Sequence, residues 1–408
     1  MRNLLSVINH FRTVSRIPAT LARSLSYWLR AVRAKVSPPV CTKLLILDDA
    51  FPNTLSSFRI AEFNYYLSHF PDCVVFSTQA VPWPGKSHRW TVARYREQFP
   101  ELAQRWRRWH PDIRVTAELA YCIFVNNAFT FIDYIEENRI PFVFTLYPGG
   151  GFQLYDSVSD QKLRRICRSP CFRHVISTQS VTTNYLIDRG FVTTDQVTFI
   201  YGGVLPKPLA DGGESKDPQL NSINICFVAN RYMPGGFDKG FDLFIDVARR
   251  LVRQHSNVEF HVVGEWSHQD HDTSDLAERI HYYGTQPTEF FATFYLKMDA
   301  ILSPNRANKL APGAFDGFPT GCCVDAGMAG VAVFCTDPLQ LNGPFIEREE
   351  IVIIPADGEE ISQILAAYLL SLSTLDELRK RGQAKFCQVF DLESQMQARY
   401  ALLHRETE

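Results

Sequence analysis

Short apolar runs alternate with stretches of helical length through most of the chain, and this alternation constrains the fold more than any other feature. In the first half, the runs predicted to be buried strands are 44–47, 73–76, 122–125, 142–146, 174–178 and 197–201. In the second half they are 223–229, 258–264, 280–284, 298–304, 331–336 and 351–355. Buried runs separated by amphipathic segments are typical of parallel β-α units, so the sequence predicts two doubly wound α/β domains.

Residues 206–221 separate the two halves and have the composition of a linker, because Pro, Gly, Asp and Ser dominate there and apolar residues are scarce. They divide the chain into a first Rossmann-like domain at 41–205 and a second at 222–374. A long helical pattern over 375–408 closes the chain.

The first 40 residues differ from the rest and have the pattern of two short amphipathic helices broken at Pro18. Residues 1–43 contain eight Lys or Arg and no acidic residue. A basic amphipathic segment of this kind either packs on the domain that follows it or lies on an anionic membrane surface, and the sequence leaves both open.

Composition excludes several classes of protein. With 42 Lys plus Arg against 44 Asp plus Glu, the formal charge of −2 does not support a surface built to bind nucleic acid. No apolar run approaches the ~20 residues that a membrane-spanning helix needs. The ten cysteines are scattered without metal-finger spacing. We therefore expect reduced thiols and a cytoplasmic protein, peripheral on the inner membrane face if the basic segment binds lipid.

Two cations follow the first strand of the second domain. Asn230 and Arg231 come directly after the run 223–229, and Lys239-Gly240 opens the next predicted helix. Fixed cations beside a helix N-terminus suit an anion, because the free N–H groups and the helix dipole also favour negative charge there. Exposed Arg and Lys side chains in a loop would have the same sequence pattern. The pair therefore indicates an anion site only if a second sequence element agrees with it.

That second element is the segment AFDGFPTGCCVDAGMAG at 314–330. A turn containing Asp316 leads into a helix expected to begin near Cys322 or Cys323, with Asp325 in its first turns. A carboxylate at the C-terminal edge of a parallel sheet is suited to hold a ribose or sugar hydroxyl, and glycines let the backbone approach a ligand closely. A helix–strand connection with a capping acid is the alternative.

Together these elements resemble the C-terminal domain of retaining glycosyltransferases of the GT-B fold, in particular glycosyltransferase family 4 (glycosyl transferases group 1). Asn230-Arg231 and Lys239-Gly240 match the GR…KG element of that family. Asp325, followed by Ala, matches the EA-x-A-x-G helix. The chain departs from the family pattern in having Asp instead of Glu at both acidic positions, and Asp325 follows Asp316 by nine positions instead of eight.

The resemblance implies a GT-B protein whose two Rossmann-like domains face a central cleft, with 41–205 binding the acceptor, 222–374 binding the donor and the helix at 375–408 crossing back to the first domain. It implies catalytic roles for Arg231, Lys239 and Asp316, the two cations holding the donor diphosphate. It implies that Asn230, Gly240, Gly317, Phe318, Pro319, Thr320, Gly321 and Asp325 bind the donor.

The resemblance also implies the partners. The donor is a nucleotide-sugar and the acceptor is a glycan or a lipid-linked molecule, in polysaccharide or glycoconjugate synthesis. No metal and no other cofactor is expected, because fixed cations neutralise the diphosphate. No nucleic-acid partner is expected either.

The first half resembles the family only in its alternation of strands and helices. Ser57 and Arg59 open the helix after the first strand, at a position suited to phosphate. Tyr147 stands after a strand where many relatives have His, and Gly149 and Gly150 begin a run of three glycines behind it. We expect these residues on the acceptor side, with a tight turn as the alternative for the glycines.

Three other functions fit parts of the sequence. Asp270 and Asp272 form a DxD triplet of the kind that holds Mg²⁺ or Mn²⁺ on a diphosphate, although a solvated loop gives the same letters. A nucleotide-sugar 2-epimerase shares the fold but lacks the Arg…Lys-Gly pair. A non-catalytic nucleotide- or glycan-binding protein of the same fold is the third.

Overall fold

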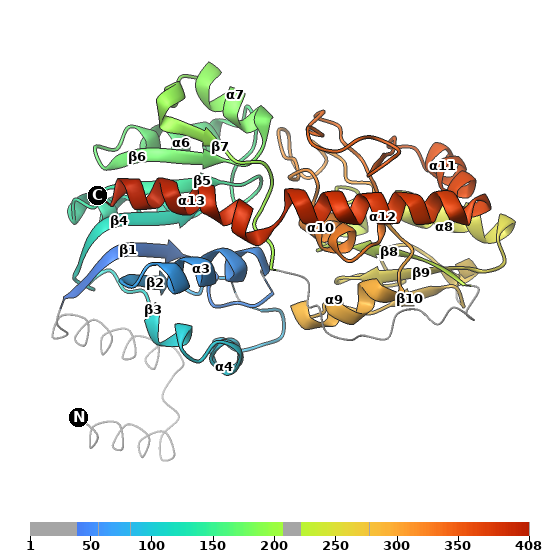
Figure 1. The fold of residues 1–408 in the computed structure, drawn as a ribbon, viewed down its shortest axis with the longest axis horizontal. Helices are drawn as coiled ribbons and strands as arrows, with labels where there is room; N and C mark the ends of the chain where they lie inside the picture. The colour runs from blue at the N-terminus through green and yellow to red at the C-terminus, as the bar shows by residue number, and fades with distance from the viewer. Residues whose placement is uncertain (1–38, 56, 82, 207–221, 277, 408) are drawn as a thin grey trace, which may run out of the picture.

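The computed structural model describes residues 39–55, 57–81, 83–206, 222–276 and 278–407. The helices predicted in the basic N-terminal segment, and all of the predicted linker except its first residue, lie outside the described residues. Figure 1 shows two α/β lobes side by side, with the last two helices of the chain crossing from one lobe to the other. Among the described residues, none of the helices is long and apolar enough to cross a bilayer.

The first lobe is built on a seven-stranded parallel sheet with the order β3-β2-β1-β4-β5-β6-β7. Its strands are β1 (Val40–Asp48), β2 (Cys73–Ser77), β3 (Trp106–Arg108), β4 (Val115–Ile123), β5 (Phe142–Leu146), β6 (Phe172–Ser177) and β7 (Val197–Phe199). Its helices are α3 (Ser57–His69), α4 (His88–Gln98), α5 (Val125–Glu137), α6 (Ser157–Cys167) and α7 (Ser180–Asp188). The strand order reverses between β1 and β4, as it does in Rossmann-like sheets.

The second lobe is built on a six-stranded parallel sheet with the order β10-β9-β8-β11-β12-β13. Its strands are β8 (Ile223–Val228), β9 (Val258–Val263), β10 (Ile280–Tyr282), β11 (Ala300–Ser303), β12 (Ala332–Cys335) and β13 (Val352–Ile353). Its helices are α8 (Phe241–Gln254), α9 (Thr288–Phe294), α10 (Gly321–Met328) and α11 (Gly358–Leu370). The prediction of two doubly wound parallel sheets is confirmed.

The strands are apolar on both sides because helices cover both faces of each sheet. In β1, Leu45 and Leu47 pack into one core cluster, which also contains Phe131 of α5. Leu44 and Ile46, on the opposite face, pack into another. Neighbouring residues of a strand point to opposite faces, so a sheet buried on both sides needs continuous apolar runs.

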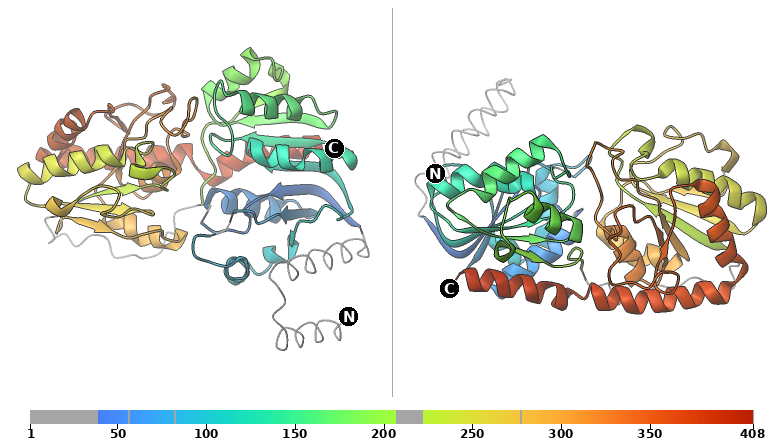
Figure 2. Two further views of the ribbon diagram at one scale, coloured as in Figure 1. Left: turned by 180° about the vertical axis from the view of Figure 1, so that it is seen from behind. Right: turned by 90° about the horizontal axis from the view of Figure 1, so that it is seen from above.

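The C-terminal region contains two helices where the sequence pattern predicted one. They are α12 (Leu372–Val389) and α13 (Leu392–Glu406), and the Asp391 side chain caps α13 by accepting from Ser394 N at 2.9 Å. Contacts of α12 are mainly with α10 in the second lobe, and α13 contacts α3 in the first. Figure 2 shows the pair running along one side of both lobes.

Candidate functional site

Residues of both lobes line a cleft between them. Because the strands of each sheet are parallel, the loops that follow them gather at one edge. The cleft has a volume of about 430 Å³, within the ~300–1,000 Å³ of small-molecule sites. Residues that follow strands in its wall are Tyr147 and Pro148 after β5, Thr178 and Gln179 after β6, Asn230 after β8, Gly264 after β9, Thr285 after β10 and Asn305 after β11.

Most of the residues predicted to hold a donor line this cleft. They are Asn230, Lys239, Asp316, Gly317, Pro319, Thr320, Gly321 and Asp325. Phe318 is buried in the core of the second lobe instead. Gly240 lies behind the wall, where it precedes α8 with φ of 69°, and a Cβ there would lie 2.1 Å from the carbonyl oxygen of Pro304. Only glycine fits this close approach.

Lys239 and Asp316 form the charged centre of the cleft. The Lys239 Nζ lies 2.5 Å from Asp316 Oδ1, and Lys239 is only 7% exposed. Burial lowers the pKa of Lys239, but the neighbouring Asp316, with Tyr232 and Asp238, outweighs burial and raises the pKa above the ordinary lysine value. The ammonium therefore stays charged inside the cleft.

Asn305 orients the Asp316 carboxylate and was not among the predicted site residues. Its Nδ2 donates to Asp316 Oδ2 at 2.9 Å, so that Lys239 and Asn305 each bind one oxygen of the carboxylate. The available signal in the sequence is its place directly after the run 298–304, since residues that follow parallel strands face the ligand edge.

The N-terminus of α10 opens into the same cleft. The helix begins at Gly321, just before the predicted start, and the side chain of its N-cap Thr320 makes no capping hydrogen bond. The first N–H groups of a helix have no partner within it, and they carry the positive end of the helix dipole. With Lys239 nearby in the cleft wall, these groups make a site for an anion.

Asp325 lies one turn into α10 and faces the cleft. No hydrogen bond or ion pair to its carboxylate is found in the part of the chain that the structure describes. Burial raises the pKa of Asp325 to about 7. A desolvated carboxylate without a partner is a strong acceptor for the hydroxyl groups of a ligand.

Arg231, predicted as the second cation, points elsewhere. It is absent from the residues that line the cleft, and its Nη1 lies 2.7 Å from Asp270 Oδ1. The two carboxylates of the DxD triplet have different partners. Asp270 accepts a hydrogen bond from Ser267 N at 3.0 Å, and Asp272 accepts one from Ser274 N at 3.0 Å. Among the described residues, no group of His, Cys, Asp or Glu is arranged to hold a metal ion.

On the acceptor side, the structure places Ser57 and Tyr147 in the cleft wall but turns the Tyr147 hydroxyl away from it. That hydroxyl donates to Glu62 Oε2 at 2.9 Å, inside the first lobe. Arg59 does not line the cleft, because its guanidinium pairs with Asp48 at 3.1 Å and with Asp49 at 2.9 Å. The position predicted to suit phosphate is thus occupied by carboxylates.

The three glycines form a turn that packs on its own lobe. Phe152 N donates to Gly149 O at 3.0 Å, which closes the turn. Gly150 has a φ of 54°, and a Cβ there would lie 2.3 Å from the ring of Phe124. Neither Gly149 nor Gly150 lines the cleft, so the close backbone approach is to Phe124.

Residues of the first lobe hold the Asp316 loop in place. The Gly313 carbonyl accepts from Leu154 N at 2.9 Å, and the Phe315 side chain packs into the core of the first lobe. Gln179 Nε2 donates to Phe318 O at 3.3 Å. None of these contacts was predicted, because they join residues that are far apart in the sequence.

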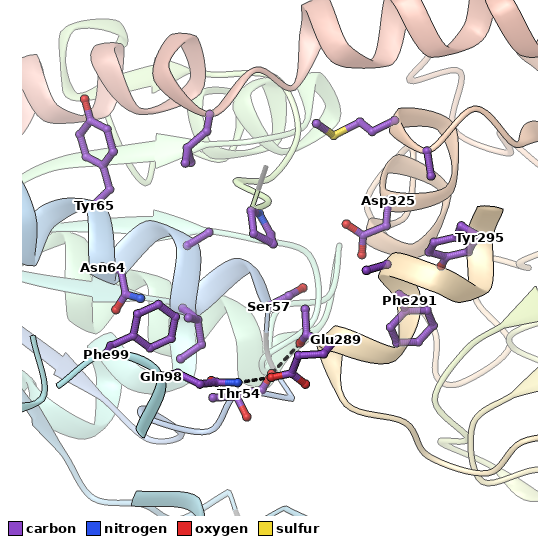
Figure 3. Close-up of a pocket in the computed structure, with 18 of the residues that line it drawn as sticks. Thr54, Ser57, Asn64, Tyr65, Gln98, Phe99, Glu289, Phe291, Tyr295 and Asp325 are labelled. Atoms are coloured by element: carbon purple, nitrogen blue, oxygen red, sulfur yellow. Dashed lines mark hydrogen bonds between the residues drawn. The ribbon is translucent and has the colours of Figure 1, made fainter. Parts of the chain in front are cut away.

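A larger cavity of about 1020 Å³ adjoins the cleft. The residues that line both are Ser57, Thr288, Phe291, Tyr295 and Asp325. Figure 3 shows Asp325 on one wall of this cavity and Asn64 on the opposite one. Its described lining contains carboxylates but no Lys or Arg. Among the described residues that line the two spaces, Lys239 of the smaller cleft is therefore the cation available to an anionic ligand.

Neither a scan against protein-family models nor a search of curated proteins finds a match. Solved structures do share the architecture. HepE from Anabaena, in complexes with UDP and with UDP-glucose, aligns over 89% of this chain and 100% of its own at a TM-score of 0.63, with 13% and 14% identity. Sucrose-phosphate synthase from Thermosynechococcus elongatus aligns over 89% of this chain and 99% of its own, at a TM-score of 0.58 and 13% identity.

A glycosyltransferase from Rickettsia africae aligns over 91% of this chain and 100% of its own, at a TM-score of 0.59 and 10% identity. At identities of this size, the likeness establishes architecture and not activity. The two parallel sheets, the cleft between them and the crossing C-terminal helices identify the GT-B fold, and this chain adopts it.

Proposed function

We propose that the chain is a glycosyltransferase that moves a sugar from a nucleoside diphosphate sugar to an acceptor hydroxyl, with retention of anomeric configuration and without a metal ion. The proposal depends on one observation: Lys239, Asp316 and the N-terminus of α10 converge in the interdomain cleft of a GT-B fold. The similar HepE structure contains UDP-glucose, which supports a nucleotide-sugar as the donor.

In this mechanism, the bond between the anomeric carbon and the β-phosphate oxygen breaks, and negative charge develops on the departing diphosphate. The Lys239 ammonium and the N–H groups of α10 stabilise that charge, because both are held in place before the bond breaks. For retention, the acceptor hydroxyl approaches from the face that the diphosphate leaves. Its oxygen bonds to the anomeric carbon, and its proton passes to the departing phosphate oxygen.

The remaining residues hold the substrates. Asp325 accepts hydrogen bonds from the ribose hydroxyls, and Asp316, fixed by Asn305, faces the transferred sugar. Arg231 contributes to diphosphate binding only if its side chain leaves Asp270. A glycan or lipid-linked acceptor enters beside Ser57 and the Tyr147 ring. The basic N-terminal segment either contacts an anionic membrane or packs on the first domain.

Two measurements test the proposal. UDP and UDP-glucose should raise the melting temperature, because a ligand that binds only the folded state stabilises it. If nucleoside diphosphates of all common bases leave the melting temperature unchanged, the proposal is wrong. Turnover of the sugar nucleotide should continue in excess EDTA. Loss of turnover in EDTA with recovery on adding Mn²⁺ would contradict the metal-free mechanism.

A further inference from the structure

Tyr232 is an exposed aromatic side chain in the wall of the cleft. It is 60% exposed, and among the large apolar side chains that the described residues leave exposed, no other one lines this cleft. Apolar side chains scattered over a surface need no explanation, but aromatic rings inside a concave site commonly contact the ligand.

The loop that presents Tyr232 is held from behind. Gly236 has a φ of 63°, and a Cβ there would lie 2.3 Å from the Trp266 ring, so the backbone packs directly on the indole. His271 Nε2 lies 2.8 Å from the Gly235 carbonyl oxygen. A loop braced in this way loses little backbone entropy when a ligand binds to it.

Lys239 places the Tyr232 ring beside the charged centre of the cleft. The Lys239 Nζ lies 4.9 Å from the centroid of the ring and 2.5 Å from Asp316 Oδ1. The ring is therefore adjacent to the cation proposed for the diphosphate and close to the carboxylate proposed for the transferred sugar. A group attached to a diphosphate bound at Lys239 would therefore be within reach of the ring.

We infer that Tyr232 is the stacking surface for the hexose of the donor, and so a specificity-determining residue. The inference rests on the proposed function. A hexopyranose with equatorial hydroxyls presents a face of C–H groups, and such a face packs against the electron-rich face of an aromatic ring. A sugar with an axial hydroxyl on that face packs less closely.

The experiment measures the affinities of UDP and UDP-glucose by isothermal titration calorimetry for the wild type, Tyr232→Ala and Tyr232→Phe. Tyr232→Ala should weaken UDP-glucose binding ~10-fold while changing UDP binding less than ~3-fold, because only the sugar contacts the ring. Tyr232→Phe should retain both affinities, since it keeps the aromatic face. Tyr155→Ala is the matched control, because Tyr155 is 78% exposed and lies outside the cleft.

The other possible outcomes distinguish failure of the inference from failure of the proposed function. Equal UDP-glucose affinities of the wild type and Tyr232→Ala overturn the inference and leave the proposed function standing. Equal losses for UDP and UDP-glucose show that the ring contacts the nucleotide, which also overturns the inference. A wild type that binds neither ligand overturns the proposed donor, and the inference with it.

Discussion

Lys239 stays charged although it is almost fully buried, because the Asp316 carboxylate lies 2.5 Å away. A buried ion pair of this kind adds little to stability, since desolvation of both groups offsets their attraction. Its presence in the cleft is better explained by function. When a diphosphate arrives, the same ammonium exchanges part of its interaction with Asp316 for the phosphate oxygens.

We predict that Lys239→Met lowers the catalytic rate of sugar transfer by ~100-fold or more, because it removes a fixed donor aimed at developing charge. The comparison is Lys309→Met, which removes an exposed cation outside the cleft and should leave the rate unchanged. Turnover of UDP-glucose by each variant is the measurement. Near-normal turnover of Lys239→Met would mean that α10 alone stabilises the leaving group.

The pKa of Asp325 is about 7 in the folded protein, well above the ordinary value of 3.8. Between those two values, stability falls as pH rises, since the native state keeps a proton that the unfolded chain has lost. Asp325→Asn removes this penalty. The melting temperature of the free variant should exceed that of the wild type at pH 8, and the difference should be smaller at pH 5, where less of the penalty has accumulated.

The same variant should bind UDP ~10-fold more weakly at pH 8, the cost of a lost charge-assisted hydrogen bond. Stability and binding thus change in opposite directions, as expected for a residue kept for function. The exposed Asp72 provides the control Asp72→Asn, which should change neither quantity. A melting-temperature difference of equal size at pH 5 and pH 8 would show that the carboxylate titrates normally.

At the scale of elements, α13 is attached to the first lobe by a buried arginine. Arg399 is fully buried and donates to Gln395 O at 2.7 Å and to Gly202 O at 3.2 Å. Its positive charge also interacts with the carboxylate of Glu62, which is fully buried on α3. Burial raises the pKa of Glu62, and the Arg399 charge partly offsets that rise.

Arg399→Leu should therefore lower the free energy of unfolding by ~3 kcal/mol or more at pH 8, because it leaves the Glu62 carboxylate buried without a counter-charge. Glu62→Gln in the same chain should restore part of the loss, and a double-mutant cycle by urea unfolding measures the coupling. The loss should be smaller at pH 5, where Glu62 is protonated more easily. Purely additive effects would show that the two groups act independently.

At the scale of the whole molecule, contacts between the lobes hold the cleft together. Leu154 N donates to Gly313 O, and Phe315 enters the core of the first lobe. Beside the larger cavity, Arg94 of α4 pairs with Glu289 of α9 at 2.9 Å. The Asp316 loop belongs to the second lobe but is positioned by the first, so catalysis should depend on how the lobes meet.

Gly313→Ala tests this dependence without touching the cleft. A Cβ at Gly313, where φ is 78°, would lie 1.8 Å from the Leu154 carbonyl oxygen, so the loop must move away from the first lobe. The rate of sugar transfer should fall ~10-fold or more, as expected when a positioned group is displaced. UDP affinity should change little, since Lys239 and α10 are not moved directly.

Gly343→Ala is the matched control, because nothing lies within 4 Å of the Cβ that it adds. Turnover and UDP affinity should both stay at wild-type values in that variant. Equal activity of the Gly313 and Gly343 variants would mean that the lobes need not meet at this loop for transfer.

The sequence by itself determined the fold class. Strands buried on both faces need continuous apolar runs, and such runs, separated by helical patterns, could be located without knowing any contact. The convergence of Lys239, Asp316 and Asp325 also followed from sequence order and family resemblance, since loops after parallel strands share one edge of the sheet. The edge strand β3 was missed, because Trp106–Arg108 is three residues long and carries two exposed arginines.

The tertiary structure alone decided which partner each side chain meets. Arg231 and Arg59 are residues of the type that binds phosphate. Each of them instead forms ion pairs with carboxylates of its own lobe. Tyr147 lies at the predicted strand end, yet its hydroxyl turns inward to Glu62. Periodicity determines which face of an element is buried, because that depends on local spacing. The direction of a charged or polar group depends on contacts between residues distant in the sequence, which no local pattern contains.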